Sequence, residues 1–220
     1  MKFKGKRLFL VSLLCISTLV EAKGYPDHWW KVVDQKEAKW WEVLPQKAQP
    51  GEVVLSKRNE LGLLSNFAAT PFVLDGKRYA SLEGFWQMML YPESSNDQRI
   101  NKKVQWKYTR EQVAHMVAFE AKKAGDLAYN NMKILGINYV TYQGKKIIYK
   151  TSEKGDHYKL ILRATLAKLE QNPKVQAVLM QTKGLRLVPD HVQPLDAPPS
   201  WKYHKIYMEI RDKDLLKQTL

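Results

Sequence analysis

Residues 63–91 read LLSNFAATPFVLDGKRYASLEGFWQMMLY, and they place a loop, a hairpin and a helix in close succession. The Asp-Gly pair at residues 75–76 lies between two short runs that fit strands, which is a strong signal for a two-residue hairpin turn. Ser81 then caps a helix that we expect to run to about Tyr91, because Pro92 stops it. Short strands packed with short helices are typical of an α+β fold.

The helix predicted after the hairpin carries a candidate site. Glu83, Trp86 and Gln87 follow a spacing that places them on one helix face, with Leu90 one turn later. A glutamate in a first turn is common for structural reasons alone, since the helix dipole favours it. An amide one turn later, among aromatic residues, favours a binding role, because desolvated polar groups need partners that a ligand can supply. Asn66 in the preceding loop has an amide suited to ribose hydroxyls or the edge of a base.

The rest of the chain is predicted to contain more helix than strand. Further strands are expected at residues 52–56, 139–142, 145–149, 185–188 and 206–210, the last because apolar and polar residues alternate there. Helices are expected after a Thr109–Gln112 capping box through residue 121, from Asp156 to Asn172, and from Pro173 to about Gln181. No alternation of strands and helices supports a parallel sheet. We therefore predict a predominantly helical α+β fold with short β-hairpins.

The N-terminus has the pattern of a secretory signal peptide. Lysines and an arginine in the first seven residues precede an apolar run at residues 8–20, and Ala22 offers a cleavage site. The run is shorter than the ~20 residues that span a bilayer, so an uncleaved anchor is the weaker alternative. We expect residues 1–22 to be removed, leaving a periplasmic or secreted protein without a membrane span.

Charge and composition limit the function further. Cleavage after Ala22 would remove four of the 36 Lys and Arg residues and one of the 22 Asp and Glu residues, leaving a formal charge of +11. This balance predicts anionic partners such as nucleotides, nucleic acid or a membrane surface, with a merely solvated basic surface as the alternative. The single cysteine, Cys15, lies in the signal. No metal-binding His or Cys spacing and no glycine-rich phosphate loop occur, so no metal or cofactor is expected.

A tryptophan-rich arm is expected at residues 23–50, before a single domain at residues 51–213. Its four tryptophans form two pairs, Trp29 with Trp30 and Trp40 with Trp41. A separation of ten or eleven residues is close to three helical turns, so the pairs would share one helix face. We interpret the arm as packing on the domain rather than as a ligand cage, because large aromatic residues mostly serve packing.

The central stretch resembles the NADAR or YbiA-like family through an LSNF motif, a Pro-Phe pair, and Gly-x-x-Tyr-x-Ser-x-Glu-x-x-Trp-Gln. Residues 121–125, 157–173 and 206–211 resemble the family's Ala-Lys-x-x-Gly segment, its later helix and its closing strand. The resemblance implies a YbiA-like domain and an N-glycosidase that cuts the bond between ribose and a nitrogen base or amine. It implies as substrate a nucleotide-like small molecule, such as an early riboflavin-pathway intermediate, or an ADP-ribosylated guanine base.

The resemblance and the chemistry of N-glycoside cleavage together assign roles to single residues. Cutting an N-glycoside needs a carboxylate to stabilise an oxocarbenium-like state and orient water, and a means of protonating the leaving nitrogen. Lys122, Lys123 and Arg78 are alternative phosphate ligands. We expect catalysis from Glu83 and Asn66, and substrate binding from Ser65, Phe67, Trp86, Gln87, Lys122 and Trp201.

One departure from the family leaves the function open. Many members have a lysine, thought to attack the anomeric carbon, where this chain has Leu90. Leucine cannot act as a nucleophile. The alternative to an exported N-glycosidase is therefore a catalytically impaired module that binds a nucleotide or ADP-ribose. A third alternative is a basic protein that contacts nucleic acid or an envelope surface through charge, with strong salt dependence.

Overall fold

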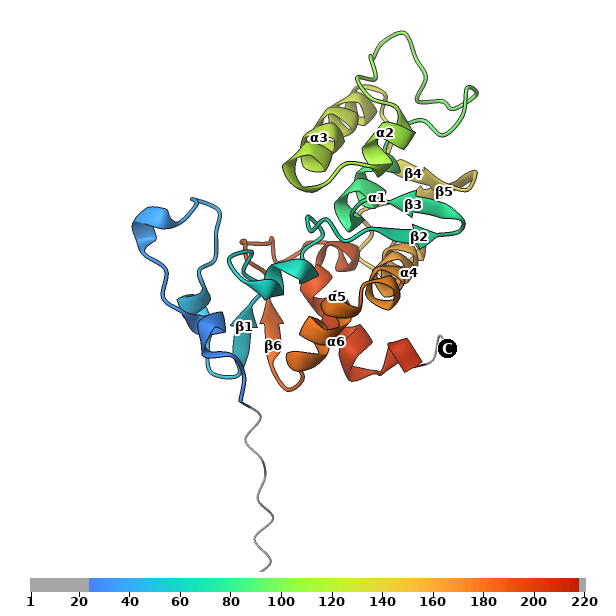
Figure 1. Ribbon diagram of the computed structural model, residues 1–220. Helices are drawn as coiled ribbons and strands as arrows, with labels where there is room; N and C mark the ends of the chain where they lie inside the picture. Colours follow the sequence, from blue (N-terminus) through green and yellow to red (C-terminus); the bar gives the residue numbers. More distant parts are fainter. Residues whose placement is uncertain (1–23, 218–220) are drawn as a thin grey trace, which may run out of the picture.

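The computed structural model describes residues 24–217, so the proposed signal peptide lies outside the described residues (Figure 1). The α-helices are α1 (Leu82–Met88), α2 (Arg110–Ala114), α3 (Ala118–Ile134), α4 (Asp156–Gln171), α5 (Pro173–Gln181) and α6 (Tyr203–Asp212). The strands are β1 (Glu52–Val54), β2 (Phe72–Leu74), β3 (Lys77–Tyr79), β4 (Tyr139–Tyr142), β5 (Lys145–Ile148) and β6 (Arg186–Val188). Helix exceeds strand, and the strands form separate two-stranded sheets, which confirms the predominantly helical α+β prediction.

Both predicted hairpins are present, as Figure 1 shows. β2 pairs antiparallel with β3, and the turn residues Asp75 and Gly76 have φ angles of 50° and 76°. β4 pairs with β5 in the same way, through Gln143 and Gly144 at 49° and 72°. Two successive positive φ angles suit the twist of a two-residue hairpin, and glycine accepts them without strain.

α1 begins at the predicted cap and ends at Met88, about one turn earlier than expected. Ser81 Oγ accepts a hydrogen bond from the backbone N–H of Gly84 at 2.9 Å and donates one to the carbonyl of Met116, also at 2.9 Å. A Cβ on Gly84 would lie 2.5 Å from the Met116 carbonyl oxygen. The start of α1 is thus packed directly on the backbone between α2 and α3.

The prediction of one helix from the Thr109 capping box through residue 121 is wrong, although the capping box itself is present. α2 ends at Ala114, and α3 begins at Ala118, whose φ is 49°. The backbone N–H of Ala80 donates to the Ala114 carbonyl at 3.1 Å. The carbonyl groups at this break therefore accept hydrogen bonds from residues that follow the β2–β3 hairpin. In a continuous helix, they would accept hydrogen bonds from backbone N–H groups of the helix itself.

Residues 206–210 were expected to form a strand, and this prediction is wrong because they lie in α6. Tyr203, Ile206, Tyr207 and Ile210 are all buried. They follow the i, i+3, i+4, i+7 spacing of a helix face. Within residues 206–210 alone, the same residues alternate between apolar and polar, and this pattern is also typical of a strand. The partner of β1 is instead β6, in a parallel pair that the sequence pattern did not predict.

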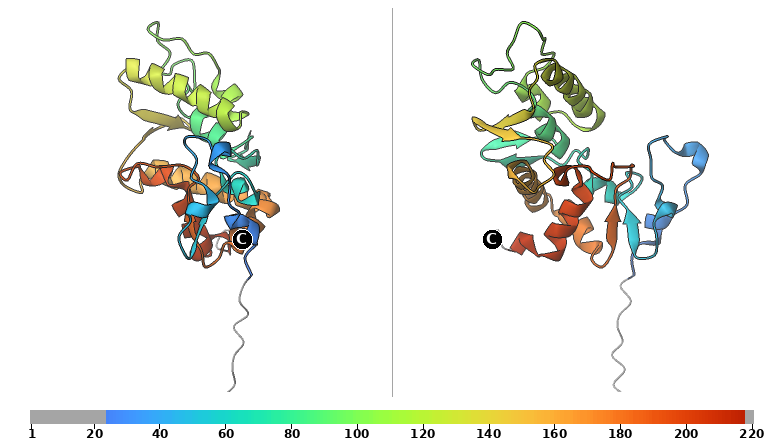
Figure 2. Two further views of the ribbon diagram at one scale, coloured as in Figure 1. Left: turned by 90° about the vertical axis from the view of Figure 1, so that its left-hand side faces the viewer. Right: turned by 180° about the vertical axis from the view of Figure 1, so that it is seen from behind.

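The arm, described from residue 24, lies on the outer side of β1, away from the helices, in Figure 1 and in the right-hand view of Figure 2. Trp29 is fully buried and donates through Nε1 to Glu60 Oε1 at 2.6 Å, while Trp30 Nε1 donates to the Glu52 carbonyl at 2.8 Å. The arm contains short 3₁₀ turns and no α-helix, so the expected helical face is wrong. Two of these turns end on an extended residue, Ala38 and Ala48, which stops the helical backbone there.

No helix within residues 24–217 has both the length and the apolar character needed to cross a bilayer.

Candidate functional site

A cavity of about 770 Å³, here called the glutamate cavity, lies between α1, α3 and the loops at residues 65–67 and 190–201. Its volume falls in the range of small-molecule sites. All predicted site residues line it: Ser65, Asn66, Phe67, Glu83, Trp86, Gln87, Lys122 and Trp201. The structure thus brings together residues that are up to 136 positions apart in the chain.

Glu83 is a buried carboxyl group in the wall of the cavity, with 7% of its surface exposed. Its Oε1 accepts a hydrogen bond from Gln87 Nε2 at 2.8 Å, and its backbone N–H donates to the Asn66 carbonyl at 2.9 Å. Burial raises the pKa of Glu83, and the Gln87 hydrogen bond and the charge of Lys122 offset part of that rise. A carboxyl group with raised basicity is suited to exchanging a proton during a reaction.

The position of the Gln87 amide depends on a glycine in α3. A Cβ on Gly125 would lie 1.8 Å from Gln87 Oε1 and 2.2 Å from its Cδ. Gly125 therefore leaves the space that the Gln87 side chain occupies while it holds Glu83. The sequence suggested Gly125 only as part of a family segment, without this role.

Lys168 of α4 fixes the Ser65–Phe67 loop through hydrogen bonds to the backbone. Lys168 is fully buried and donates through Nζ to the carbonyls of Leu63 and Ser65, at 2.8 and 3.0 Å. Burial lowers the pKa of Lys168 to about 7. The Ser65 hydroxyl accepts from the Phe67 N–H at 3.2 Å, whereas the Asn66 amide makes no hydrogen bond to another residue of the described chain. Asn66 can thus offer its amide to a ligand, while Ser65 mainly shapes the turn.

Aromatic side chains form much of the wall. Trp86 is buried, and its ring meets His157 edge-on with 4.9 Å between centroids. Phe67 contacts Phe119 in the same manner at 5.1 Å. Trp40 of the arm is 97% exposed and also lines the cavity. The arm therefore divides into a packed first half and a second half that reaches the cavity.

Four lysines line the glutamate cavity. The lysines that line it are Lys57, Lys122, Lys123 and Lys150. Lys122 forms an ion pair of 2.5 Å with Asp126, and the Lys150 ammonium lies 3.9 Å from the centre of the Tyr129 ring. This concentration of cations favours an anionic ligand.

Sequence reasoning missed a pair of adjacent residues in the loop after β6. His191 lines the cavity, and its Nδ1 lies 3.0 Å from Asp190 Oδ1. Asp190 is 2% exposed and also pairs with Lys57. Burial acts to raise the pKa of Asp190, but the hydrogen bond from His191 and the charge of Lys57 lower it below its ordinary value. No sequence spacing indicates this pair, because its setting comes from distant parts of the chain.

Two further features of the wall bear on function. Leu90 is buried and lines the cavity, so no amine stands at this position of the wall. Trp201 Nε1 and Gln193 Oε1 are buried without a hydrogen-bond partner among residues 24–217, and both residues line the cavity. Buried polar atoms of this kind are rare and indicate that something else completes the site.

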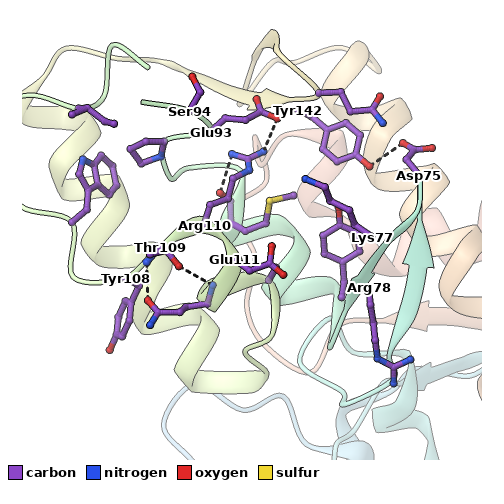
Figure 3. A pocket seen from close by; sticks show the side chains of 18 of the residues that line it. Asp75, Lys77, Arg78, Glu93, Ser94, Tyr108, Thr109, Arg110, Glu111 and Tyr142 are labelled. Atoms are coloured by element: carbon purple, nitrogen blue, oxygen red, sulfur yellow. Dashed lines mark hydrogen bonds and ion pairs between the residues drawn. The ribbon is translucent and has the colours of Figure 1, made fainter. Parts of the chain in front are cut away.

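A second cavity of about 690 Å³ lies beside the β2–β3 hairpin and α2 (Figure 3). Two of its charged groups are paired within the protein: Arg110 donates to the carbonyls of Met88 and Tyr91, and Asp75 accepts a hydrogen bond from the Tyr142 hydroxyl at 2.9 Å. Arg78, an alternative phosphate ligand in the sequence analysis, lines this second cavity instead of the glutamate cavity. The paired groups favour a structural role here.

Within residues 24–217, no group of three or more His, Cys, Asp or Glu residues is placed to hold a metal ion.

Comparisons with known proteins give one similarity. No model of a known protein family matches the chain, and no curated protein matches it. Among solved structures, the NMR structure of the Escherichia coli protein YbiA is similar, with a TM-score of 0.44 and 17% sequence identity. The match covers 82% of this chain and 92% of the other. The features of the glutamate cavity described above rest on this chain's own residues.

Proposed function

We propose that this protein hydrolyses the bond between ribose and a nitrogen base or amine in a nucleotide-derived substrate, and that the reaction takes place in the glutamate cavity. The observation that carries the proposal is the position of Glu83, a buried carboxyl group that opens onto a cavity of nucleoside-compatible size. The unpaired Asn66 amide and the Trp86 ring face the same space. These are the groups that a sugar, a flat ring and a cationic transition state require.

In the proposed reaction, Glu83 acts on the sugar. Cleavage of an N-glycoside builds positive charge on the anomeric carbon and ring oxygen, which the carboxylate stabilises. The raised pKa of Glu83 makes it a better base for the attacking water. Gln87 fixes the carboxylate through its 2.8 Å hydrogen bond, and Asn66 holds ribose hydroxyls.

The rest of the substrate is bound by charge and by stacking. Lys122 and Lys123 on α3 offer ammonium groups to phosphate oxygens. The exposed ring of Trp40 and the ring of Phe67 offer surfaces on which a base can stack. This combination favours a phosphorylated nucleoside over a plain sugar.

The test is to incubate the chain without its proposed signal with ADP-ribosylated guanosine, NAD and a ribosylaminopyrimidine phosphate. Release of a free base or amine, separated by chromatography, is the expected result. The variant Glu83→Gln keeps the size and shape of the side chain and should release product about 100-fold or more slowly. Product from Glu83→Gln at the wild-type rate would contradict the proposal.

The second candidate is a binding module, and the burial of Leu90 in the cavity wall favours it, since no amine nucleophile stands there. It predicts that ADP-ribose binds, by calorimetry, while none of the three compounds is cleaved. Binding that collapses with added salt and is unchanged in Glu83→Gln would instead favour contact through surface charge.

We also propose that the protein acts after export, on the basis of the basic and apolar pattern before Ala22. The intact mass of the protein recovered from the periplasm or medium of an expressing bacterium should correspond to a chain beginning at Lys23. Recovery of the full-length chain from the cytoplasm alone would contradict export.

A further inference from the structure

The proposed hydrolysis leaves one chemical task without a residue. When the bond to an amine nitrogen breaks, the electron pair goes to that nitrogen, which must gain a proton to leave as a stable group. Glu83 is occupied with the sugar and the attacking water. A proton donor is therefore needed elsewhere in the cavity wall.

His191 has the position that this task requires. It lines the glutamate cavity, and 41% of its side chain is exposed, so a ligand can reach the ring. Glu83 and His191 line the same cavity. They come from different elements, α1 and the loop after β6, and so approach the cavity from different directions.

The ring of His191 is also held in one orientation. Asp190 Oδ1 lies 3.0 Å from Nδ1, and the Tyr203 ring stacks on the imidazole at 6.1 Å with an interplanar angle of 10°. Asp190 is fixed in turn by Lys57 and by the Tyr203 hydroxyl at 3.3 Å. A buried carboxylate that hydrogen-bonds to Nδ1 fixes the orientation of a histidine ring.

The other ring nitrogen remains available. Among the described residues, His191 Nε2 has one hydrogen-bond contact, with Gln193 Nε2 at 3.5 Å, which is the limit of a hydrogen bond. The ring therefore directs its second nitrogen away from Asp190 without a short contact to another described residue.

We propose that His191, oriented by Asp190, is the catalytic acid that protonates the leaving nitrogen; this rests on the proposed hydrolase function. Water attacks the anomeric carbon and gives a proton to the Glu83 carboxylate. The carbon–nitrogen bond breaks with its electron pair on nitrogen, and that nitrogen takes the proton from His191 Nε2. The products are the hydroxylated sugar and the neutral base or amine. Proton exchange with solvent restores both residues.

The experiment compares two substrates that share ADP-ribose and differ in their leaving groups. The nitrogen of ADP-ribosylated guanosine must be protonated, whereas the nicotinamide of NAD leaves as a neutral pyridine without a proton. His191→Gln should lower kcat/KM for ADP-ribosylated guanosine by about 100-fold and that for NAD by no more than about threefold. His115→Gln, at an exposed histidine that follows α2, is the matched control and should change neither.

The possible outcomes separate two claims, the acid role of His191 and the proposed hydrolysis. Equal losses on both substrates would show that His191 only supports the fold or binding, and would overturn the inference while hydrolysis stands. Where the wild type cleaves only ADP-ribosylated guanosine, added imidazole should restore turnover to His191→Ala but not to Glu83→Gln, and no restoration would overturn the inference. Absence of product from the wild type with both compounds would contradict the proposed hydrolysis itself, and the inference would fail with it.

Discussion

Glu83 combines burial with a position on the cavity wall, and this combination determines how a reaction would depend on pH. The carboxylate is the form that can accept a proton from water. Burial raises its pKa above the ordinary value of 4.5, so the active form is lost at a higher pH than for a surface glutamate. We expect the kcat/KM of the wild type to rise with pH through that raised pKa. Glu83→Gln should lose about 100-fold or more activity, and its kcat/KM should no longer depend on pH in that range. A wild-type profile that falls across the same range would contradict the assignment.

At the residue scale, the sequence identifies the groups that share a local spacing. Glu83 and Gln87 lie one helical turn apart, so their contact follows from helix geometry. Asp190 and His191 could not be identified in this way. The Asp190 carboxylate is held by Lys57, which is 133 residues away, and by Tyr203, which is 13 residues away, and only the folded chain brings these groups together.

At the element scale, the contact between α1 and α3 at Gly125 can be tested without disturbing the fold. A Cβ there overlaps the flexible end of Gln87, which can rotate away, so Gly125→Ala should change the free energy of unfolding by less than about 1 kcal/mol. The rotation breaks the hydrogen bond to Glu83, and kcat/KM should fall by about tenfold or more. Steady-state kinetics and denaturant unfolding measure the two effects.

The control for this prediction is Gln87→Ala, which removes the same hydrogen bond directly. The double variant should be no slower than Gln87→Ala alone, because both changes act on one contact. Losses that add in the double variant would mean that Gly125 acts on the cavity by another route.

Gly84 presents the opposite case within α1. A Cβ there would lie 2.5 Å from the Met116 carbonyl and 2.9 Å from that of Val113, and backbone atoms cannot rotate away. Gly84→Ala should destabilise the protein by about 1–3 kcal/mol or more in chemical denaturation, despite the higher helix propensity of alanine. A stability equal to that of the wild type would show that α1 is not packed on the α2–α3 connection as described.

Local signals predict the elements whose geometry they control. The Asp-Gly pair at residues 75–76 determines its hairpin, and Ser81 determines the start of α1. The break before Ala118 and the helix at Tyr203–Asp212 could not be predicted in the same way. The first depends on hydrogen bonds from the hairpin, and the second on a buried face that only the complete core defines.

At the scale of the whole molecule, Lys168 links the fold to the cavity loop and gives stability a distinct pH dependence. Its pKa is about 7 in the folded protein, against 10.5 for an unperturbed lysine. The unfolded chain therefore binds one more proton between these values, and stability should rise with pH across that window. From about pH 7 to about pH 10, the wild type should gain up to about 3 kcal/mol relative to Lys168→Met.

Urea unfolding of both proteins at the two pH values measures this difference. All other ionisable groups are shared, so subtracting the Lys168→Met result isolates one residue. Parallel changes in the two proteins would show that Lys168 keeps its ordinary pKa and is not sealed beneath the loop.

The parallel pairing of β1 with β6 also belongs to the whole molecule. The two strands are separated by most of the domain, and neither has a sequence signal that names its partner. Their pairing places the loop at residues 190–201 beside the cavity. The parts of the site predicted from sequence are therefore those on α1 and its preceding loop, while the opposite wall had to come from the structure.

The most direct test of the central claim is hydrolysis of ADP-ribosylated guanosine in water enriched in oxygen-18, followed by mass spectrometry of both products. The account predicts that the heavy oxygen is found in the released ADP-ribose and not in the guanosine, and that Glu83→Gln forms both products about 100-fold or more slowly. Intact substrate with the folded wild-type protein, or an equal yield from Glu83→Gln, would contradict it.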